Sequence, residues 1–259
     1  MAINVNTVYQ TVLLILNKEQ RGYVTPTEFN SLGTQVQLEI FEKYFEDLNQ
    51  LIRVPQTDTD YADRVTNLDE KIAIFKTYGD ANYVTTTPSG ASSSLSYWTL
   101  PGLDAYGEEV TFYRLGTVLY NSDTEVQRID RKEFYEVEKS LLTKPSKSFP
   151  IYLYENYKLF IKPDTIVTQG DVQVDYIRQP ISPIWGFDVG TLGQYTYNSS
   201  LYNANTMPTG SRDFELHLSE QTNVILQILK YAGIIIEDPQ IVQDAAQQVA
   251  INEQNEKIY

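Results

Sequence analysis

The chain has 259 residues, of which 42% are hydrophobic, so it is expected to be an ordinary globular protein of one large or two small domains, not a disordered one. Its 34 acidic and 20 basic residues leave a net charge of −14, which disfavours nucleic-acid binding. The absence of cysteine and the presence of one histidine exclude thiol catalysis and metal centres built on cysteine or several histidines. Twenty tyrosines favour large protein–protein contact surfaces, although β-rich folds also use this residue.

The N-terminal part of the chain predicts helices. Apolar residues at helical spacing predict the first one over residues 5–18. Thr25-Pro26-Thr27-Glu28 is typical of a helix start, because the threonine and glutamate side chains can each satisfy a free backbone amide of the first turn. A long helix should follow, and a third is expected from about Asp60, with Gly79 as its stop.

Strand signals dominate the middle of the chain. Residues 85–94 have the composition of a loop, and two short apolar runs on either side of Gly116 predict a hairpin. Asp130-Arg131-Lys132-Glu133 predicts the start of a short helix. Further strands are expected at 151–153, 158–161 and 172–176, the last of them half buried because its residues alternate. Pro180 and Pro183 should end the sheet.

The last part of the chain predicts a long loop and then two helices. The loop covers residues 181–210, an unusual length for a compact domain unless the segment binds something or contains an unrecognised hairpin. The first helix is expected from Asp213 to Ala232, with Gly233 as its stop, and Asp238-Pro239 predicts the start of the second.

These elements predict an α+β fold. The N- and C-terminal helices should pack as a helical bundle, with a central antiparallel β-rich region inserted between them, because each terminal helix carries an apolar stripe that needs a partner. The expected segments are 1–80 for the N-terminal helices, 81–210 for the β-rich region with its long loops, and 211–259 for the C-terminal helices.

The sequence offers little catalytic chemistry. His217 is predicted to be a surface or interface residue within a helix, since no serine elbow motif accompanies it. The adjacent Glu108 and Glu109 would point to opposite faces of a strand, which disfavours a glycosidase dyad. Asp58 and Asp60 lack the rest of a calcium loop and are interpreted as capping residues. No glycine-rich phosphate loop is present, and no cofactor or metal is expected.

Aromatic residues of the 181–210 loop are the candidate binding residues. They are Trp185, Phe187, Tyr195, Tyr197 and Tyr202. As a protein-contact arm, the loop needs only mobility and amphipathic rings, whereas a sugar platform needs rings that face one groove. In a third interpretation the loop folds back on its own core.

Several stretches resemble a family of virion structural proteins of tailed phages, including crAss-like phages. They are Asn4–Gln10, Asn17–Asn30, Glu39–Phe45, Thr143–Ser146, Val174–Pro180 and Glu220–Gly233. The resemblance implies a ring or adaptor at the head–tail junction, in a homo-oligomer with the 12-fold symmetry usual for portals. Its implied partners are the portal protein and other tail or ring proteins, with passing DNA touched only non-specifically.

The resemblance implies no catalytic residues, and it does not separate a connector ring from another tail ring. The longest apolar run, Val12–Leu16, is far shorter than the roughly 20 residues of a membrane span, so no membrane segment is expected. A carbohydrate-binding or adhesin-like tail module is the alternative, and an acid-dyad glycosidase is a more remote one.

Overall fold

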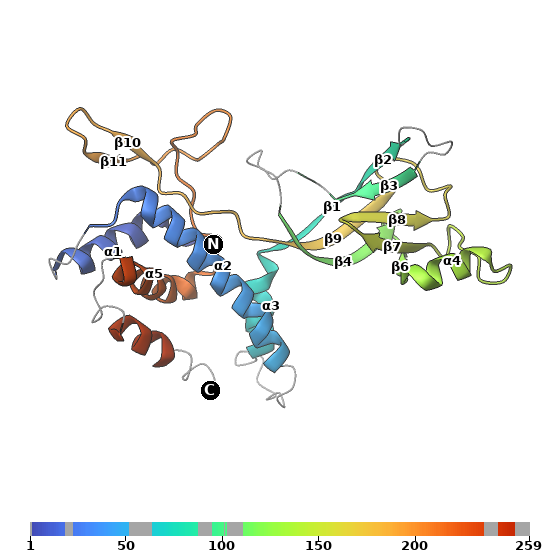
Figure 1. The fold of residues 1–259 in the computed structure, drawn as a ribbon, viewed down its shortest axis with the longest axis horizontal. Coiled ribbons are helices and arrows are strands. Elements are labelled where there is room, and N and C mark those ends of the chain that lie inside the picture. The colour runs from blue at the N-terminus through green and yellow to red at the C-terminus, as the bar shows by residue number, and fades with distance from the viewer. Residues whose placement is uncertain are drawn as a thin grey trace. The chain divides into compact units, whose positions relative to one another are not determined.

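The computed structural model describes residues 2–18, 23–51, 64–87, 95–100, 102, 111–235 and 243–251 (Figure 1). The chain forms two compact units. Residues 1–74 and 180–259 make up a helical unit, and residues 75–179 make up a β unit. The predicted α+β class is confirmed: helices lie at both ends of the chain and a β-rich region lies between them.

Helices α1 (Val5–Lys18), α2 (Pro26–Leu51), α3 (Arg64–Ala73) and α5 (Gln221–Ile235) build the helical unit, together with the 3₁₀ turn η1 (Leu218–Glu220) and a helical stretch at 243–251. The predicted capping box is confirmed at the start of α2. The backbone N–H of Thr25 donates to Glu28 Oε2 over 2.9 Å, and the Glu28 N–H donates to Thr25 Oγ1 over 3.4 Å. Both bonds satisfy amides that have no partner within the helix.

α5 packs against both α1 and α2, and α3 packs against α2. The N-terminus joins this bundle through its backbone, because Ile3 and Phe214 form an antiparallel bridge with hydrogen bonds of 3.1 and 3.0 Å. Asp213 Oδ1 accepts from the Val5 N–H over 2.9 Å and so caps α1 from a distant part of the chain. The N-terminal residues and the segment before α5 are therefore held together by hydrogen bonds.

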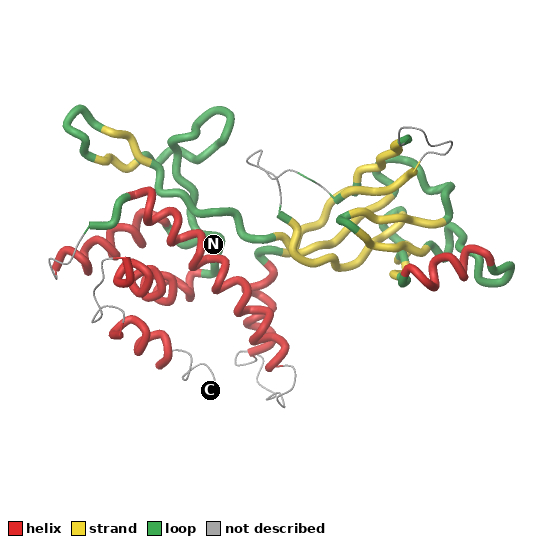
Figure 2. The backbone as a smooth tube through the Cα atoms, in the orientation of Figure 1, coloured by secondary structure: helices red, strands yellow, loops and turns green. Residues whose placement is uncertain are grey.

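Two sheets make up the β unit (Figure 2). The five-stranded sheet has the order β2-β3-β8-β7-β6, and the four-stranded sheet has the order β1-β9-β4-β5. Their bounds are β1 Lys76–Asp80, β2 Asn82–Thr86, β3 Leu95–Thr99, β4 Phe112–Tyr120, β5 Thr124–Glu125, β6 Gln127–Arg128, β7 Ile151–Glu155, β8 Lys158–Lys162 and β9 Val172–Arg178. All the pairings are antiparallel except that of β6 with β7.

Both sheets contribute to one core, in which Trp98, Leu159 and Val174 are buried. Helix α4 (Arg131–Lys139) covers a second, smaller apolar cluster, where Phe134 packs with Ile151 and Leu153 of β7. Residues of a strand alternate between its faces, so these two β7 residues lie under α4 while Tyr152 between them joins the main core. The alternation predicted for residues 172–176 is confirmed in the same way.

Three glycine-based predictions are wrong. Gly79 does not stop α3, because the helix ends at Ala73 and Gly79 pairs with Val174 inside β1. Gly116 is not a hairpin turn but an irregular point within the single strand β4, where the register against β9 shifts. Gly233 does not stop α5, which continues to Ile235. Thr85 and Thr86 also belong to β2 and not to a loop; the rest of that predicted loop, from 88 to 94, lies outside the described residues.

Residues 180–210 belong to the helical unit, whereas the sequence suggested that they belong to the β-rich region. They contain the short hairpin of β10 (Phe187–Val189) and β11 (Tyr195–Tyr197). The helix predicted from Asp213 starts only at Gln221, because Phe214 is held in the extended bridge to Ile3. The predicted helix start at Asp238 lies outside the described residues.

Candidate functional site

Residues 181–212 form a projecting segment, here called the arm, whose two ends are tied together. Ile184 and Arg212 exchange backbone hydrogen bonds of 2.9 and 2.7 Å. The arm then makes two excursions, the β10–β11 hairpin and the loop 198–210, which Figure 2 shows leaving the helices. Arg212 is buried, donates from Nε to the Ser182 carbonyl over 2.7 Å, and lies over the Tyr202 ring at 4.8 Å. The base of the arm is therefore a fixed structure.

One face of α2 seats the base of the arm. Asn30, Gly33 and Gln37 follow one another at spacings of three and four residues, so they share that face. Asn30 Oδ1 accepts from the backbone N–H of Trp185 over 2.8 Å, and Gln37 Nε2 donates to the Ile181 carbonyl over 2.8 Å. A Cβ on Gly33 would lie 3.2 Å from the Phe214 ring, so the glycine allows close approach.

Trp185 lies in this base and is only 5% exposed. Its indole N–H donates to Asn6 Oδ1 over 3.0 Å, and its ring centroid is 4.4 Å from that of Tyr9 on α1. Phe187 and Tyr197 continue the aromatic cluster, with centroids 6.0 and 5.6 Å from Trp185. The interpretation that the loop folds back on its own core is therefore correct for Trp185, and a sugar has no access to its ring.

The two excursions cross closely where they leave the base. A Cβ on Gly186 would lie 2.3 Å from the Thr209 carbonyl oxygen, so only glycine fits at this crossing. The Gly186 N–H donates to Ser211 Oγ over 3.0 Å, and that hydroxyl donates to the Asn198 carbonyl over 2.5 Å. These contacts fix the direction in which both excursions leave the molecule.

The outer part of the arm is nearly free of charge and exposes apolar residues among uncharged polar ones. Its exposed apolar residues are Val189, Leu192, Tyr195, Leu201 and Met207, and Leu192 is 92% exposed. Asp188 and the buried Arg212 are the only charged residues of the 32 in residues 181–212. In a chain of net charge −14, this is a local depletion of charge, which is typical of the centre of a protein–protein interface.

The predicted binding residues thus divide into two groups. Trp185 is buried in the base, while Phe187, Tyr197 and Tyr202 are half buried and Tyr195 is exposed. Burial raises the pKa of Tyr9 beneath them, with a further contribution from its hydrogen bond with Tyr23. Tyr9 therefore stays a neutral hydrogen-bond donor, and its hydroxyl donates to the Val24 carbonyl over 3.2 Å.

His217 lies before a 3₁₀ turn and not within a helix, which corrects the sequence prediction. Its Nδ1 accepts from the Ser219 N–H over 3.3 Å and lies 2.9 Å from Ser219 Oγ. Because the serine is two residues away in the same turn, local capping accounts for both contacts. Glu108, Glu109, Asp58 and Asp60 lie outside the described residues.

Among the residues with described positions, no group of three or more acidic or histidine side chains is arranged to hold a metal ion. Within the same part of the chain, none of the helices has the length and apolar character needed to cross a membrane.

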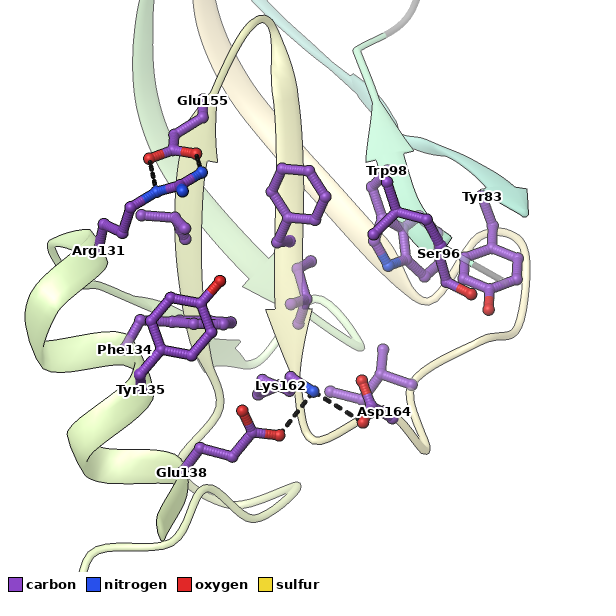
Figure 3. A pocket seen from close by; sticks show the side chains of 15 residues that line it. Tyr83, Ser96, Trp98, Arg131, Phe134, Tyr135, Glu138, Glu155, Lys162 and Asp164 are labelled. Carbon is purple, nitrogen blue, oxygen red and sulfur yellow. Dashed lines mark hydrogen bonds and ion pairs between the residues drawn. The ribbon is translucent and has the colours of Figure 1, made fainter. Parts of the chain in front are cut away.

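A second surface feature lies in the β unit, where a groove of about 510 Å³ separates α4 from strand β3 (Figure 3). Buried side chains such as Trp98 and Ile166 form its floor, and Tyr83, Leu95 and Tyr135 line it nearer the surface. Two ion-paired groups complete the walls. Arg131 makes a two-pronged ion pair with Glu155, and Lys162 Nζ lies 2.7 Å from Glu138 and 2.8 Å from Asp164.

These ion pairs keep the groove charged. The hydrogen bond from Arg131 lowers the pKa of Glu155. Burial alone would lower the pKa of Lys162, but its hydrogen bonds to Asp164 and Glu138 outweigh burial and the net shift is upward. Three carboxylates and two cations thus line the groove, which leaves it with an excess of negative charge.

No local pattern predicts the groove, because its walls come from segments that are far apart in the chain. The amides on α2 that seat the arm do have a signal in the sequence. Asn30 and Gln37 share a helix face with Gly33, a pattern that favours close approach of another segment over a solvated surface.

The chain matches no known protein-family model, and it shows no significant similarity to any curated protein.

Proposed function

We propose that this chain is a non-enzymatic structural protein of a tailed-phage virion, which forms an oligomeric ring or adaptor at the head–tail junction and links the portal to the tail. The observation that carries the proposal is the arm: an almost uncharged projection with five exposed apolar residues, on a rigid base in an otherwise strongly acidic chain. The resemblance of the sequence to virion structural proteins supports the same proposal.

The construction of the arm favours binding to a protein partner. Its base is held by buried hydrogen bonds, so little conformational freedom remains to be lost there on binding. Its outer part exposes Leu192, Tyr195 and Leu201, and moving these side chains out of water into an interface lowers the free energy. A ring subunit needs such a surface for its neighbour or for the ring above or below it.

The net charge is compatible with a position around a DNA channel. Phosphates and an acidic lumen repel each other, so DNA can pass without adhering. The proposal therefore includes only non-specific contact with DNA, and no cofactor.

The test is native mass spectrometry of the full chain, alone and with the portal protein of the phage that encodes it. We expect a closed ring, or a monomer that assembles stoichiometrically on the portal ring. Leu192→Ser and Leu201→Ser in the arm should weaken that assembly at least tenfold and leave the subunit folded. Tyr78→Ser, an exposed position in β1 of the β unit, is the matched control. The proposal would be refuted by a monomer that does not bind the portal protein, or by arm variants that assemble as the natural chain does.

A further inference from the structure

The loop that follows α4 is a second exposed apolar projection. Residues 140–149, here called the hook, continue from the end of α4 away from the sheet (Figure 1). Leu141 and Leu142 are 98% and 97% exposed, and Phe149 is also exposed. We propose that the hook of one copy of this chain docks in the groove between α4 and β3 of a second copy. This inference rests on the proposed ring and names one of the contacts between its subunits.

The hook is ordered by its own hydrogen bonds. Ser146 and Phe149 exchange backbone bonds of 3.3 and 3.1 Å, and the Thr143 N–H donates to Ser140 Oγ over 3.3 Å. Pro145 within the hook and Pro150 directly after it are buried, and both anchor the loop to the β unit. A defined turn therefore holds the leucines outward, and because this turn is already ordered, it loses little conformational entropy on binding.

The groove offers a complementary surface to the hook. Its floor and the residues nearer its opening are apolar and aromatic, which suits leucine and phenylalanine side chains. Its charged walls have one carboxylate more than they have cations. By contrast, the chain from Lys139 to Tyr154 contains three lysines and no acidic residue, although the whole protein carries −14 charges.

Charge and apolarity together favour a protein partner over a nucleic acid. Lys144 and Lys147 alone would suit phosphate, but fully exposed leucines contribute nothing to phosphate contact. An acidic, partly aromatic groove supplies partners for both kinds of side chain. Every copy carries both the hook and the groove, so hook-to-groove contacts can repeat from subunit to subunit and close a ring.

Because the natural chain contains no cysteine, introduced cysteines report the contact directly. One full-length chain carries Leu142→Cys in the hook, and a second, distinguishable by a mass tag, carries Leu95→Cys beside the groove. The two are mixed in equal amounts with a short bis-maleimide cross-linker, with and without the portal protein. We expect the 142–95 product to exceed the 142–142 and 95–95 products combined by at least fivefold. The control replaces Leu95→Cys with Tyr78→Cys, an exposed position in the four-stranded sheet of the same unit.

Variants distinguish specific docking of the hook from non-specific association of the two chains. Leu141→Asp in the Leu142→Cys chain, or the exposed Tyr135→Lys in the Leu95→Cys chain, should reduce the 142–95 product at least tenfold, while circular dichroism shows an unchanged fold. Leu141→Met should retain the product, because it conserves apolar volume. If Leu141→Asp leaves the 142–95 product unchanged, the exposed leucines do not enter the groove and the inference is wrong, whatever Lys144→Ser and Lys147→Ser do to the product.

The outcomes also distinguish this inference from the proposed function. Rings or portal complexes that form without the 142–95 product would overturn the hook-to-groove contact and leave the ring standing. A 142–95 product from a chain that never joins the portal would support the contact between copies and count against the head–tail role.

Discussion

Replacement of Trp185 by alanine tests whether the base of the arm is part of the folded core. The side chain is buried, packs against the ring of Tyr9, and donates its indole N–H to Asn6 Oδ1. Removing a buried aromatic side chain costs about 3–5 kcal/mol, and the lost hydrogen bond leaves the Asn6 amide oxygen without that donor. For a domain of this size, about 4 kcal/mol corresponds to a fall of about 8–16 °C in the midpoint of thermal unfolding.

The two tryptophans make the assay specific to each unit. Trp185 belongs to the helical unit and Trp98 to the core of the β unit, and the chain has no others. In Trp185→Ala, the helical circular dichroism signal at 222 nm should be lost at a lower temperature than in the natural chain. The Trp98 fluorescence should report unfolding of the β unit at the same temperature as in the natural chain. Trp185→Phe keeps a ring but loses the hydrogen bond, and we expect it to cost about 1 kcal/mol.

Leu192→Ser, at the exposed tip of the same arm, is the matched control. Its effect on the free energy of unfolding should stay within about 0.5 kcal/mol, because the residue is almost wholly in water. If Trp185→Ala unfolds within about 1 kcal/mol of the natural chain, the arm is not part of the core. If Trp98 fluorescence shifts in parallel, the two units do not unfold separately.

Three further predictions concern single contacts. Gly186→Ala should speed amide hydrogen exchange across the arm, measured by mass spectrometry, because the new Cβ would meet backbone atoms of the second excursion. Glu28→Ala should destabilise the chain at pH 7 by about 1 kcal/mol. The hydrogen bond from the Thr25 N–H lowers the pKa of Glu28, so this difference in stability should shrink as the pH falls below 4.5 and through that lowered pKa. Thermal unfolding of both chains at pH 7 and pH 3 measures the difference. The hydrogen bond to Glu39 raises the pKa of Tyr231 to about 12, so the stability it contributes is complete below pH 10 and is lost as pH rises through 12; unfolding of Tyr231→Phe should lack that loss.

Local signals were sufficient for the elements that are stabilised locally. The stripe of residues 5–18, the capping box at Thr25 and the alternation of residues 172–176 each carry their cause within a few residues, and all three were confirmed. The glycine predictions failed because a neighbouring strand, distant in sequence, decides what a glycine does. Gly79 pairs in register with Val174, which no pattern around residue 79 indicates.

The candidate site shows the same limit. Length and composition left open whether residues 181–210 bind something, contain a hairpin or fold back on the core, and they did not separate the buried Trp185 from the exposed tip residues. That separation depends on Asn30 and Gln37, which lie about 150 residues earlier and tie the base to α2. The extended backbone at Phe214 has an equally remote cause, its pairing with Ile3.

The distribution of charge suggests how an acidic chain of this kind assembles. A net charge of −14 keeps free copies apart through mutual repulsion, which favours association through segments with few or no acidic residues. Among the described residues, leucines that are at least 76% exposed lie in two such segments: the arm, with one acidic residue in 32, and the hook, with lysines and none. The arm can bind through burial of its exposed apolar residues, which salt hardly screens, whereas the hook lysines are attracted to a groove with one carboxylate more than cations, and salt weakens that attraction. In the proposed ring, two contacts of different physical origin would let the contact between subunits and the contact with a neighbouring ring form under different conditions, as an ordered assembly of stacked rings requires.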